Sequence, residues 1–295
     1  MSRRVLELIG VSRAPPPAAA ESLPAAGVLG RGTGRAGLVL LSVVLGFVLL
    51  VPALSGVDPL ATDGPQLAPP SAAHPFGTDQ GGRDVLVRVA DGGLRSIAAC
   101  LVVIGLAAAV GAAIGLTAAF GGRVLDAVAM RSVDVVNGIP PLIIPIAAVG
   151  VLGPSYPNLI LAVTLAYAPS YARIVRNLAG TARSRADVQS ARLFGIRTPR
   201  IVLGHILPSL ASQLVVIITL DLGSVIVALA SLSFLGFGAQ APTPEWGVLL
   251  DDGQTFYAAA PWLLVAPAAL LVLLVTALSL LGEALRDGLE ARDLR

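Results

Sequence analysis

The sequence predicts an all-α membrane protein with six transmembrane helices. Only 13% of the 295 residues are charged and the mean hydropathy is +0.83, whereas about a quarter of the residues of a soluble domain are charged. Uncharged apolar windows recur along the chain, and each approaches the roughly 20 residues that a helix needs to cross a bilayer. The arginines are divided unequally between alternate connecting segments, as in multi-pass proteins. One packed bundle is the simplest organisation for this length.

Residues 1–36 are predicted to form a disordered cytoplasmic tail ahead of a transmembrane domain at 37–295. The tail contains five arginines and a middle rich in proline and alanine. The first apolar run begins too far along the chain for an ordinary signal peptide and is too long for a signal-peptide core. We therefore expect this run to be retained as a signal anchor.

Charge-free windows place the six spans. The window Val135–Ala172 contains no charged residue, and a turn rich in glycine and proline at Gly153–Asn158 divides it into two crossings. Each of the other spans occupies a window of its own. The predicted spans are 37–56, 96–120, 133–152, 156–173, 209–232 and 261–282.

The arginines predict the orientation of the chain. If the N-terminus is cytoplasmic, the inner segments carry 17 of the 20 basic residues, and the outer segments carry only Arg83, Arg88 and Arg95. An excess of basic residues marks the cytoplasmic side of a multi-pass protein. The pattern therefore predicts a protein of the plasma (inner) membrane with both termini in the cytoplasm.

The loop Asp187–Pro208 joins the fourth and fifth spans and lies in the cytoplasm in this orientation. Its pattern predicts a short amphipathic helix, a break at Gly195 and a second helix ending at Pro208. Val188, Ala191 and Phe194 follow a three-residue spacing on one helical face, and glycine permits the turn. Because so short a helix is marginal in isolation, it needs a partner surface.

This loop resembles the cytoplasmic "EAA" loop of the membrane subunits of ABC importers. The triplet here reads Gln189-Ser190-Ala191, so two of its three residues differ from the family pattern. The match depends on Gly195, on Ile206-Leu207-Pro208 and on the position of the loop between two spans. The resemblance implies a coupling helix that docks on an ATPase. Its residues would be Asp187, Gln189, Ser190, Ala191, Arg192, Leu193, Phe194, Gly195 and Ile196.

A second motif precedes the second span. In His74–Leu86, Pro75 and Gly77 predict a turn, and Thr78 or Asp79 is expected to cap a following helix. Residue chemistry alone favours an ordinary interfacial helix in which Arg83 and Asp84 pair. The wording HPFGTDxxGRDV, however, resembles a segment of the C-type permease subunit of dipeptide, oligopeptide and nickel ABC importers.

A third motif follows the fifth span, at Ser233–Gly253. Its glycines and prolines predict a structured outer loop, either a connector or a re-entrant segment, and Trp246 and Trp262 suit the membrane interface. The wording SFLGxGxQxPxPEWG resembles the same permease family, so the resemblance runs from about residue 37 to the C-terminus. Candidate residues of the two outer motifs are Thr78, Asp79, Arg83, Asp84, Pro244, Glu245, Trp246 and Gly247.

Two acidic residues lie within or beside the predicted spans. Asp221 in the fifth span is costly in lipid, so it either lines a pore for a cationic group or makes a hydrogen bond between helices. The family resemblance gives it no role. Asp134 begins the third span and is expected to be an edge charge or a partner of Arg131.

Several function classes are disfavoured by the residues themselves. All basic residues are arginines, so a P-loop lysine is missing, and ATP with its Mg is expected in partner subunits rather than as a cofactor of this chain. His74 and His205 are too few and too far apart to argue for a metal site. The arginine cluster lacks interleaved aromatics, so nucleic-acid binding is not expected. The sequence offers no recognisable set of a nucleophile and a base that would suggest an enzyme.

The resemblance implies a subunit of an ATP-driven importer that forms half of a pore for dipeptides or oligopeptides. Its expected partners are a homologous B-type permease subunit, two cytoplasmic ATPase subunits, an extracytoplasmic substrate-binding protein and membrane lipid. The alternatives are an ion-coupled secondary transporter or channel working through Asp221, a nickel or glutathione importer subunit, and a structural scaffold. A secondary transporter would be expected to contain paired repeats with broken helices, and no convincing internal repeat is found.

Overall fold

The computed structural model describes residues 32–293, and helices dominate this range. Residues 32–36, predicted to be disordered, belong to the first helix, and the rest of the predicted tail lies outside the described residues. The helices are α3 (Gly32–Ser55), α4 (Val85–Phe120), α5 (Arg123–Asn137), α6 (Ile143–Leu152), α7 (Tyr156–Ala182), α8 (Ala186–Leu193), α9 (Thr198–Ile201), the π-helix η1 (Val202–Ile206), α10 (Leu207–Phe234), α11 (Trp246–Gln254) and α12 (Trp262–Asp293).

Five helices of the described range are long and apolar enough to cross a membrane. They are α3, α4, α7, the continuous helix from α9 through α10, and α12. Each overlaps one of the predicted spans, so the all-α, multi-pass character of the chain is confirmed.

The predicted third span is not one uninterrupted helix. Residues 133–152 are divided between α5 and the shorter apolar helix α6, with the break at Gly138–Leu142. Pro140 and Pro141 lie in this break. Because proline has no N–H and disfavours the helical conformation of the residue before it, two successive prolines end one helix before the next begins.

The helix of the second span starts well before the predicted boundary at residue 96. α4 begins at Val85, where the Asp84 carboxylate caps it by accepting a hydrogen bond from the Val87 N–H at 3.1 Å. Its 36 residues make a rod about 54 Å long, whereas the hydrocarbon core of a bilayer is about 30 Å thick. The charge-free window located only the part of the helix that follows Arg95.

Glycines on α4 allow a close contact between α4 and α7. A Cβ atom on Gly111 would lie 2.4 Å from the Tyr171 Cβ, and one on Gly115 would lie 2.5 Å from the Ala172 carbonyl oxygen. These glycines are spaced four residues apart, so both face α7. Small residues at this spacing permit close approach of membrane helices, where packing rather than the hydrophobic effect drives association.

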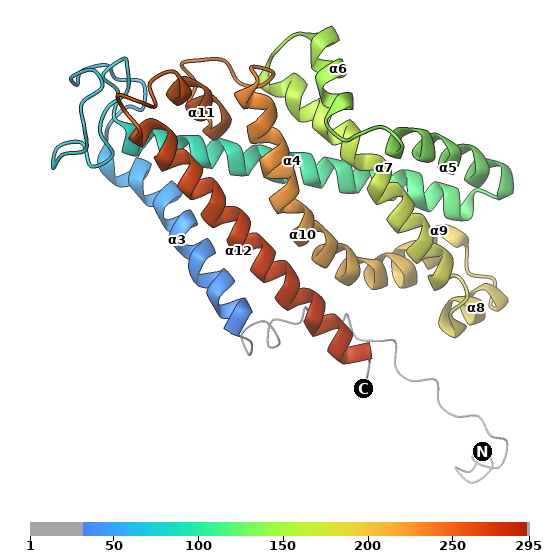
Figure 1. The fold of residues 1–295 in the computed structure, drawn as a ribbon. Helices are drawn as coiled ribbons and strands as arrows, with labels where there is room; N and C mark the ends of the chain where they lie inside the picture. Colours follow the sequence, from blue (N-terminus) through green and yellow to red (C-terminus); the bar gives the residue numbers. More distant parts are fainter. Residues whose placement is uncertain (1–31, 294–295) are drawn as a thin grey trace.

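The remaining long helices form the other side of the bundle. α3 lies alongside α12, and α10 packs against both α12 and α4 (Figure 1). α11 and the connecting loop 56–84 lie at one end of the molecule, whereas α8 and α9 lie at the opposite end (Figure 1). The chain therefore separates the two outer motifs from the Asp187–Pro208 loop by the length of the bundle.

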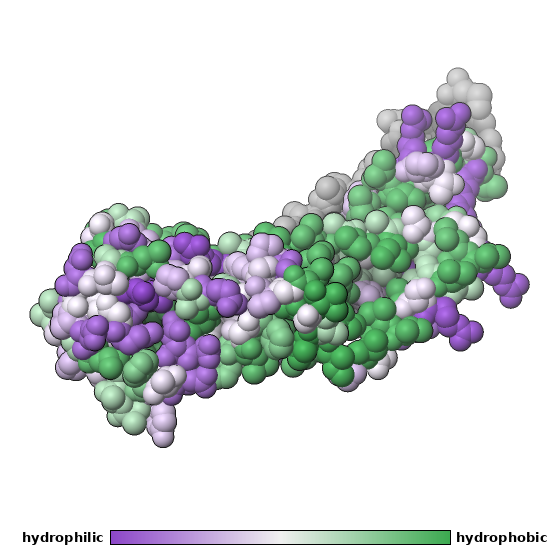
Figure 2. Space-filling view, turned by 90° about the horizontal axis from the view of Figure 1, so that it is seen from above, coloured by the Kyte–Doolittle hydropathy of each residue, from purple (hydrophilic) through white to green (hydrophobic). Residues whose placement is uncertain are grey.

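The surface carries an extensive apolar region. Hydrophobic residues fill the middle of the face in Figure 2, and hydrophilic residues gather most densely at one end. Exposed apolar side chains are present on several long helices, including Val39, Leu101 and Val265. Apolar exposure on this scale requires lipid or partner subunits around the bundle.

The glycine contact generates a stability prediction. We expect Gly115→Leu to destabilise the purified protein by about 1–3 kcal/mol or more, because the new side chain would meet the backbone of α7. Thermal unfolding in detergent measures the change. Gly105→Leu is the matched control, since a Cβ at Gly105 on the same helix meets nothing within 4 Å. Equal melting temperatures for the two variants would contradict the packing argument.

Candidate functional site

The short helix α8 is anchored on the bundle by one face. Val188 and Ala191 are 1% and 5% exposed, and they belong to an apolar cluster with Ala182 of α7 and Leu210 of α10. This cluster holds α8 against both of the long helices that it connects. Ala191 therefore contributes to internal packing.

Leu193 and Phe194 project from this anchored helix. Their exposed fractions are 89% and 86%, the largest values among the apolar side chains of the loop. The prediction that Val188, Ala191 and Phe194 share one helical face is wrong for Phe194, which is exposed while the other two are buried. α8 ends at Leu193, so the helical spacing no longer applies at Phe194.

Gly195 ends α8 in the way the sequence predicts. Its φ of +75° lies in the left-handed region. Its N–H donates to the Arg192 carbonyl at 2.9 Å, and the Ile196 N–H donates to the Ala191 carbonyl at 3.1 Å. This pair of bonds is the Schellman motif, which favours glycine at the left-handed position. The motif fixes the direction of the chain beyond Phe194.

The polar residues of α8 are exposed. Asp187 lies in the first turn and Arg192 in the last, which suits the helix dipole. Asp187 pairs with Arg185 at 3.3 Å, and the Gln189 side chain donates to the Ser184 carbonyl at 3.2 Å. An open hollow of about 620 Å³ adjoins the helix; its lining residues are Phe194, Gly195, Ile196, Arg197, Pro199 and Arg200.

The second helix of the loop does not end at Pro208. α9, η1 and α10 run on from one to the next, and Pro208 lies in the first turn of α10. In η1 the Leu207 N–H donates to the Val202 carbonyl, five residues earlier. Such a π-turn provides a break in the regular ladder of hydrogen bonds just before a residue that has no N–H. The loop is thus mechanically continuous with the long helix α10.

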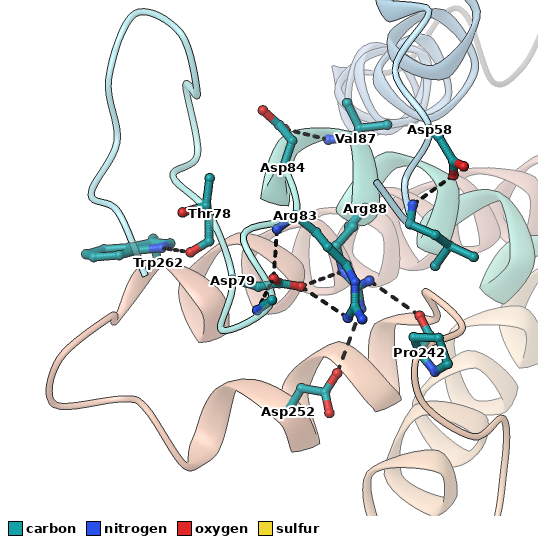
Figure 3. Close-up of polar contacts among 12 residues, drawn as sticks. Asp58, Thr78, Asp79, Arg83, Asp84, Val87, Arg88, Pro242, Asp252 and Trp262 are labelled. Carbon is teal, nitrogen blue, oxygen red and sulfur yellow. Dashed lines mark hydrogen bonds and ion pairs between the residues drawn. The ribbon is translucent and has the colours of Figure 1, made fainter. Parts of the chain in front are cut away.

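A buried ionic network organises the opposite end of the molecule (Figure 3). The Asp79 carboxylate lies 3.2 Å from Arg88 Nε and 3.6 Å from Arg83 Nη1. Arg88 also lies 3.8 Å from Asp252 and donates to the Pro242 carbonyl at 3.3 Å. The Arg88 side chain is 2% exposed. It connects the loop before α4 to the segment containing α11.

Arg88 and Asp252 were not identified from the sequence as site residues. The available signal was that Arg88 is flanked by Val87 and Val89, because a charge in such an apolar stretch needs a partner when buried. Asp252 is about 160 residues away along the chain, so spacing alone does not pair the two. Burial raises the pKa of the Asp252 carboxyl, and Arg88 opposes that rise.

Thr78 and Asp79 do not cap α4. The Thr78 hydroxyl donates to the Pro65 carbonyl and accepts from the Ala68 N–H, while Trp262 Nε1 donates to the Thr78 carbonyl at 3.2 Å. Asp79 instead accepts from the backbone N–H groups of residues 81 and 83. The predicted motif is therefore a structural connection between the 56–84 loop and α12.

The predicted pair of Arg83 with Asp84 is also wrong. Arg83 pairs with Asp79, and Asp84 lies 2.8 Å from His74 Nδ1 while capping α4. The predicted alternative for Asp134, a pair with Arg131, is replaced by an ion pair with Arg173 of α7. Arg83 and Asp79 are four residues apart, whereas Asp134 and Arg173 are 39 residues apart.

The third motif contains a short helix that the sequence did not predict. Pro244 is buried, and Glu245 caps α11 by accepting from the Val248 N–H at 3.3 Å and from the Ser96 hydroxyl at 2.8 Å. Burial raises the pKa of the Glu245 carboxyl. Gly247 allows α11 to approach α10, since a Cβ there would lie 2.4 Å from the Ala230 carbonyl oxygen.

Trp246 lies in the protein core rather than at the membrane interface. It is 0% exposed, and its indole N–H donates to the Val89 carbonyl at 2.9 Å. A Cβ on Gly93 would lie 2.7 Å from the indole ring, so the glycine provides the space that the ring occupies. The Pro-Glu-Trp-Gly sequence thus supplies a helix cap, a buried anchor and a close contact.

Asp221 makes the bond between helices that was one of its two predicted roles. The Tyr171 hydroxyl of α7 donates to an Asp221 carboxylate oxygen of α10 at 2.8 Å. The Asp221 side chain remains half-buried. Its place in the fold is therefore within the bundle and far from both the outer network and α8.

The outer network generates a second stability prediction. We expect Arg88→Leu to destabilise the protein by about 3–5 kcal/mol, because the buried Asp79 loses the closer of its two arginine partners and Asp252 loses its contact with Arg88. Thermal unfolding in detergent is the measurement, and the double variant Arg88→Leu with Asp79→Asn is expected to recover part of the loss. Arg95→Leu is the control, since the Arg95 side chain is 47% exposed and such pairs contribute about 1 kcal/mol or less. A loss no larger than that of the control would refute the role of the network.

Comparison with known proteins gives matches that cover most of the chain. Residues 111–292 match the family described as binding-protein-dependent transport system inner membrane component. The dipeptide transport system permease protein DppC of Alkalihalophilus pseudofirmus is 34% identical over 87% of this chain and 84% of its own length.

Two further relatives come from Escherichia coli. The probable D,D-dipeptide transport system permease protein DdpC of strain K12 is 38% identical over 86% of each chain. The glutathione transport system permease protein GsiD of O1:K1 is 40% identical over 76% of this chain and 74% of its own length. The chain therefore belongs to the family of inner-membrane components of binding-protein-dependent transport systems.

Proposed function

We propose that this chain forms half of the translocation pore of an ATP-driven peptide importer and receives the motion of an ATPase through α8. The observation that carries the proposal is the exposure of Leu193 and Phe194 on a helix anchored to both α7 and α10. Apolar side chains exposed on a rigid support are suited to fill a pocket of a partner protein. The surrounding arginines would orient the two surfaces by their charge.

The proposed assembly contains a homologous B-type permease, two cytoplasmic ATPase subunits and an extracytoplasmic substrate-binding protein. Dependence on a binding protein is part of the family description. ATP and Mg would be held by the ATPase subunits, because this chain has no lysine for a P-loop. Dipeptides or oligopeptides are the proposed solutes, supported by relatives named for dipeptide transport; a relative named for glutathione transport supports solutes of similar chemistry.

The proposed topology has six crossings with both termini in the cytoplasm. α5 and α6 together would make the third crossing, supported by the apolar character of α6 and the short turn from it into α7. The excess of arginine in alternate segments supports the orientation. In this arrangement α8 lies on the ATPase side, and the Asp79–Arg88 network lies on the side of the binding protein.

The proposed mechanism is alternating access. Closure of the ATPase pair on ATP would displace α8, and the buried contacts of Val188 and Ala191 would pass that displacement to α7 and α10. Rigid continuity from α9 through η1 into α10 would carry it into the membrane. ATP biases the two states because the ATPase surface that contacts Leu193 and Phe194 differs between them.

The topology is tested by labelling single cysteines. In a Cys100→Ala background, we expect Pro154→Cys to react with a membrane-impermeant maleimide in intact cells. Val124→Cys is expected to react only after permeabilisation, because the α5–α6 crossing separates the two sites. Labelling of both from outside would overturn the six-crossing arrangement, and Asp58→Cys serves as the control for an exposed outer position.

The coupling role is tested by charge substitution at the projecting pair. We expect Phe194→Asp to lower transport about tenfold or more while leaving membrane insertion unchanged. The reason is that the exposed Phe194 side chain would no longer fill an apolar pocket of the ATPase. Val124→Asp is the matched control, as Val124 is 80% exposed on α5 outside the loop. Ala191→Asp is expected to reduce the folded protein itself, since Ala191 is buried. Full transport by the Phe194 variant would reject α8 as the coupling element.

The Schellman turn offers a second variant for the same role. Gly195→Pro removes an N–H that bonds to Arg192 and imposes a negative φ where the chain needs +75°. We expect ATP hydrolysis to continue without transport, measured together in proteoliposomes. Gly204→Ala in η1 is the control, because a Cβ there meets nothing within 4 Å.

The assembly is tested by purification from mildly solubilised membranes followed by mass spectrometry. We expect a homologous permease, ATPase chains and a substrate-binding protein to accompany this chain. Recovery of the chain alone or as a homo-oligomer would reject the importer and favour an ion-coupled transporter.

A further inference from the structure

Asp221 lies near the middle of α10, at a depth where a carboxylate is costly. α10 spans Leu207–Phe234 and belongs to one of the helices apolar enough to cross a membrane. Ionisable residues within such helices face protein or water and mark functional paths or paired groups. The Asp221 side chain is half-buried within this single chain, so part of it remains accessible from outside the bundle.

In the described residues, the hydrogen-bond partner of the Asp221 carboxylate is a hydroxyl group. Tyr171 donates to one of its carboxylate oxygens at 2.8 Å. Many of the arginine side chains pair with other acids, namely Asp79, Asp91, Asp126, Asp134, Asp187 and Asp252. A hydroxyl donor leaves the negative charge of the carboxylate uncompensated, unlike a cation.

Polar side chains continue outward from Asp221 on the same helix. Ser224, one turn later, is exposed, and its hydroxyl donates to the Asp221 carbonyl at 2.8 Å. Gln213 and Ser231 are 11 residues before and seven residues after Ser224, so the three share one helical face. The exposed Leu220 and Val227 lie on the same side, so these polar groups are interspersed with apolar side chains, and Ser224 is the exposed polar group next to Asp221.

We propose that Asp221 binds the ammonium group of the transported peptide as it passes along this face of α10. An ammonium has three donors, and the two carboxylate oxygens of Asp221 with the hydroxyl oxygen of the exposed Ser224 provide acceptors for it. The N-terminus of a free peptide is an ammonium near neutral pH. One carboxylate without further charges also suits a passing solute, since conduction requires weak binding. This inference rests on the proposed function and names the charge of the solute.

The test compares uptake by the wild-type importer and its Asp221→Asn variant, with all partner subunits present. The probes are labelled dialanine, trialanine and glutathione, and the peptide that the wild type transports best is used. We expect Asp221→Asn to lower uptake about tenfold at about pH 6.5, consistent with a lost hydrogen bond to a charged group. The difference should shrink at about pH 9, because the ammonium loses its proton with a pKa of about 8.

Matched variants separate this role from packing. Asp221→Glu is expected to retain most of the uptake, and Asp134→Asn controls for loss of a carboxylate that pairs with Arg173 elsewhere on α7. Tyr171→Phe removes the bond between helices and keeps the carboxylate, so its effect is expected to be independent of pH. An effect of Asp221→Asn that is equally large at both pH values would overturn the proposal.

Two further outcomes are distinguishable. A wild-type assembly that contains its ATPases yet transports none of the three peptides would overturn the ammonium site while leaving the importer intact. A wild-type chain that purifies without ATPases or a second permease would reject the proposed function itself. Uptake that is driven by a proton gradient in the absence of ATP, and lost in Asp221→Asn, would identify an ion-coupled role and likewise overturn the ammonium site.

Discussion

The close contact of α4 with α7 is the constraint on which the arrangement of this molecule depends. In a bilayer the hydrophobic effect does not drive helices together, so close packing has to supply the attraction. Because Gly111 and Gly115 have no Cβ atom, the backbones of α4 and α7 can approach each other closely at these positions. α4 carries Arg88 near its start, and α7 leads directly into the connection to α8. The contact thus sets the position of the outer network relative to the proposed coupling helix.

Charges stabilise the two ends of this helix pair in different ways. At one end, Arg88 and Asp79 are buried together and the network connects segments far apart in the chain. At the other end, Arg176 makes two hydrogen bonds to Asp126 of α5, and Arg183 donates to the Ala119 carbonyl and lies 5.3 Å from the Phe120 ring centroid. A buried pair resists separation because an isolated charge is costly. The partly exposed contacts near α8 are less costly to rearrange.

The same contrast applies to apolar side chains. Trp246 of α11 is buried against α4 and serves the fold. Phe194 is almost fully exposed although its neighbour Ala191 is buried. An exposed aromatic residue beside a rigid turn is costly for a chain on its own and useful to a chain that has a partner. This difference separates motif residues that build the structure from those available for contact with another protein.

Apolar windows, caps and turn residues are local properties, and they were sufficient for much of the fold. The five long helices follow from charge-free windows, and the left-handed Gly195 follows from the missing Cβ. Predictions from local sequence were wrong where tertiary contacts or an irregular helical turn changed the helix boundaries. α4 extends through Arg88 because buried acids compensate its charge, and Pro208 is accommodated because η1 precedes it.

The sequence by itself determined that this chain is a helical membrane protein with motifs that resemble those of importer subunits. Hydropathy and motif spacing are local properties of the sequence, so they can be evaluated without knowing which distant residues are in contact. Only the tertiary structure decided which charges pair, that Trp246 is buried, and that Leu193 and Phe194 project while Ala191 does not. The physical reason is that burial and polar pairing depend on neighbours in space. Tyr171 and Asp221, for example, form a hydrogen bond although they lie 50 residues apart along the chain.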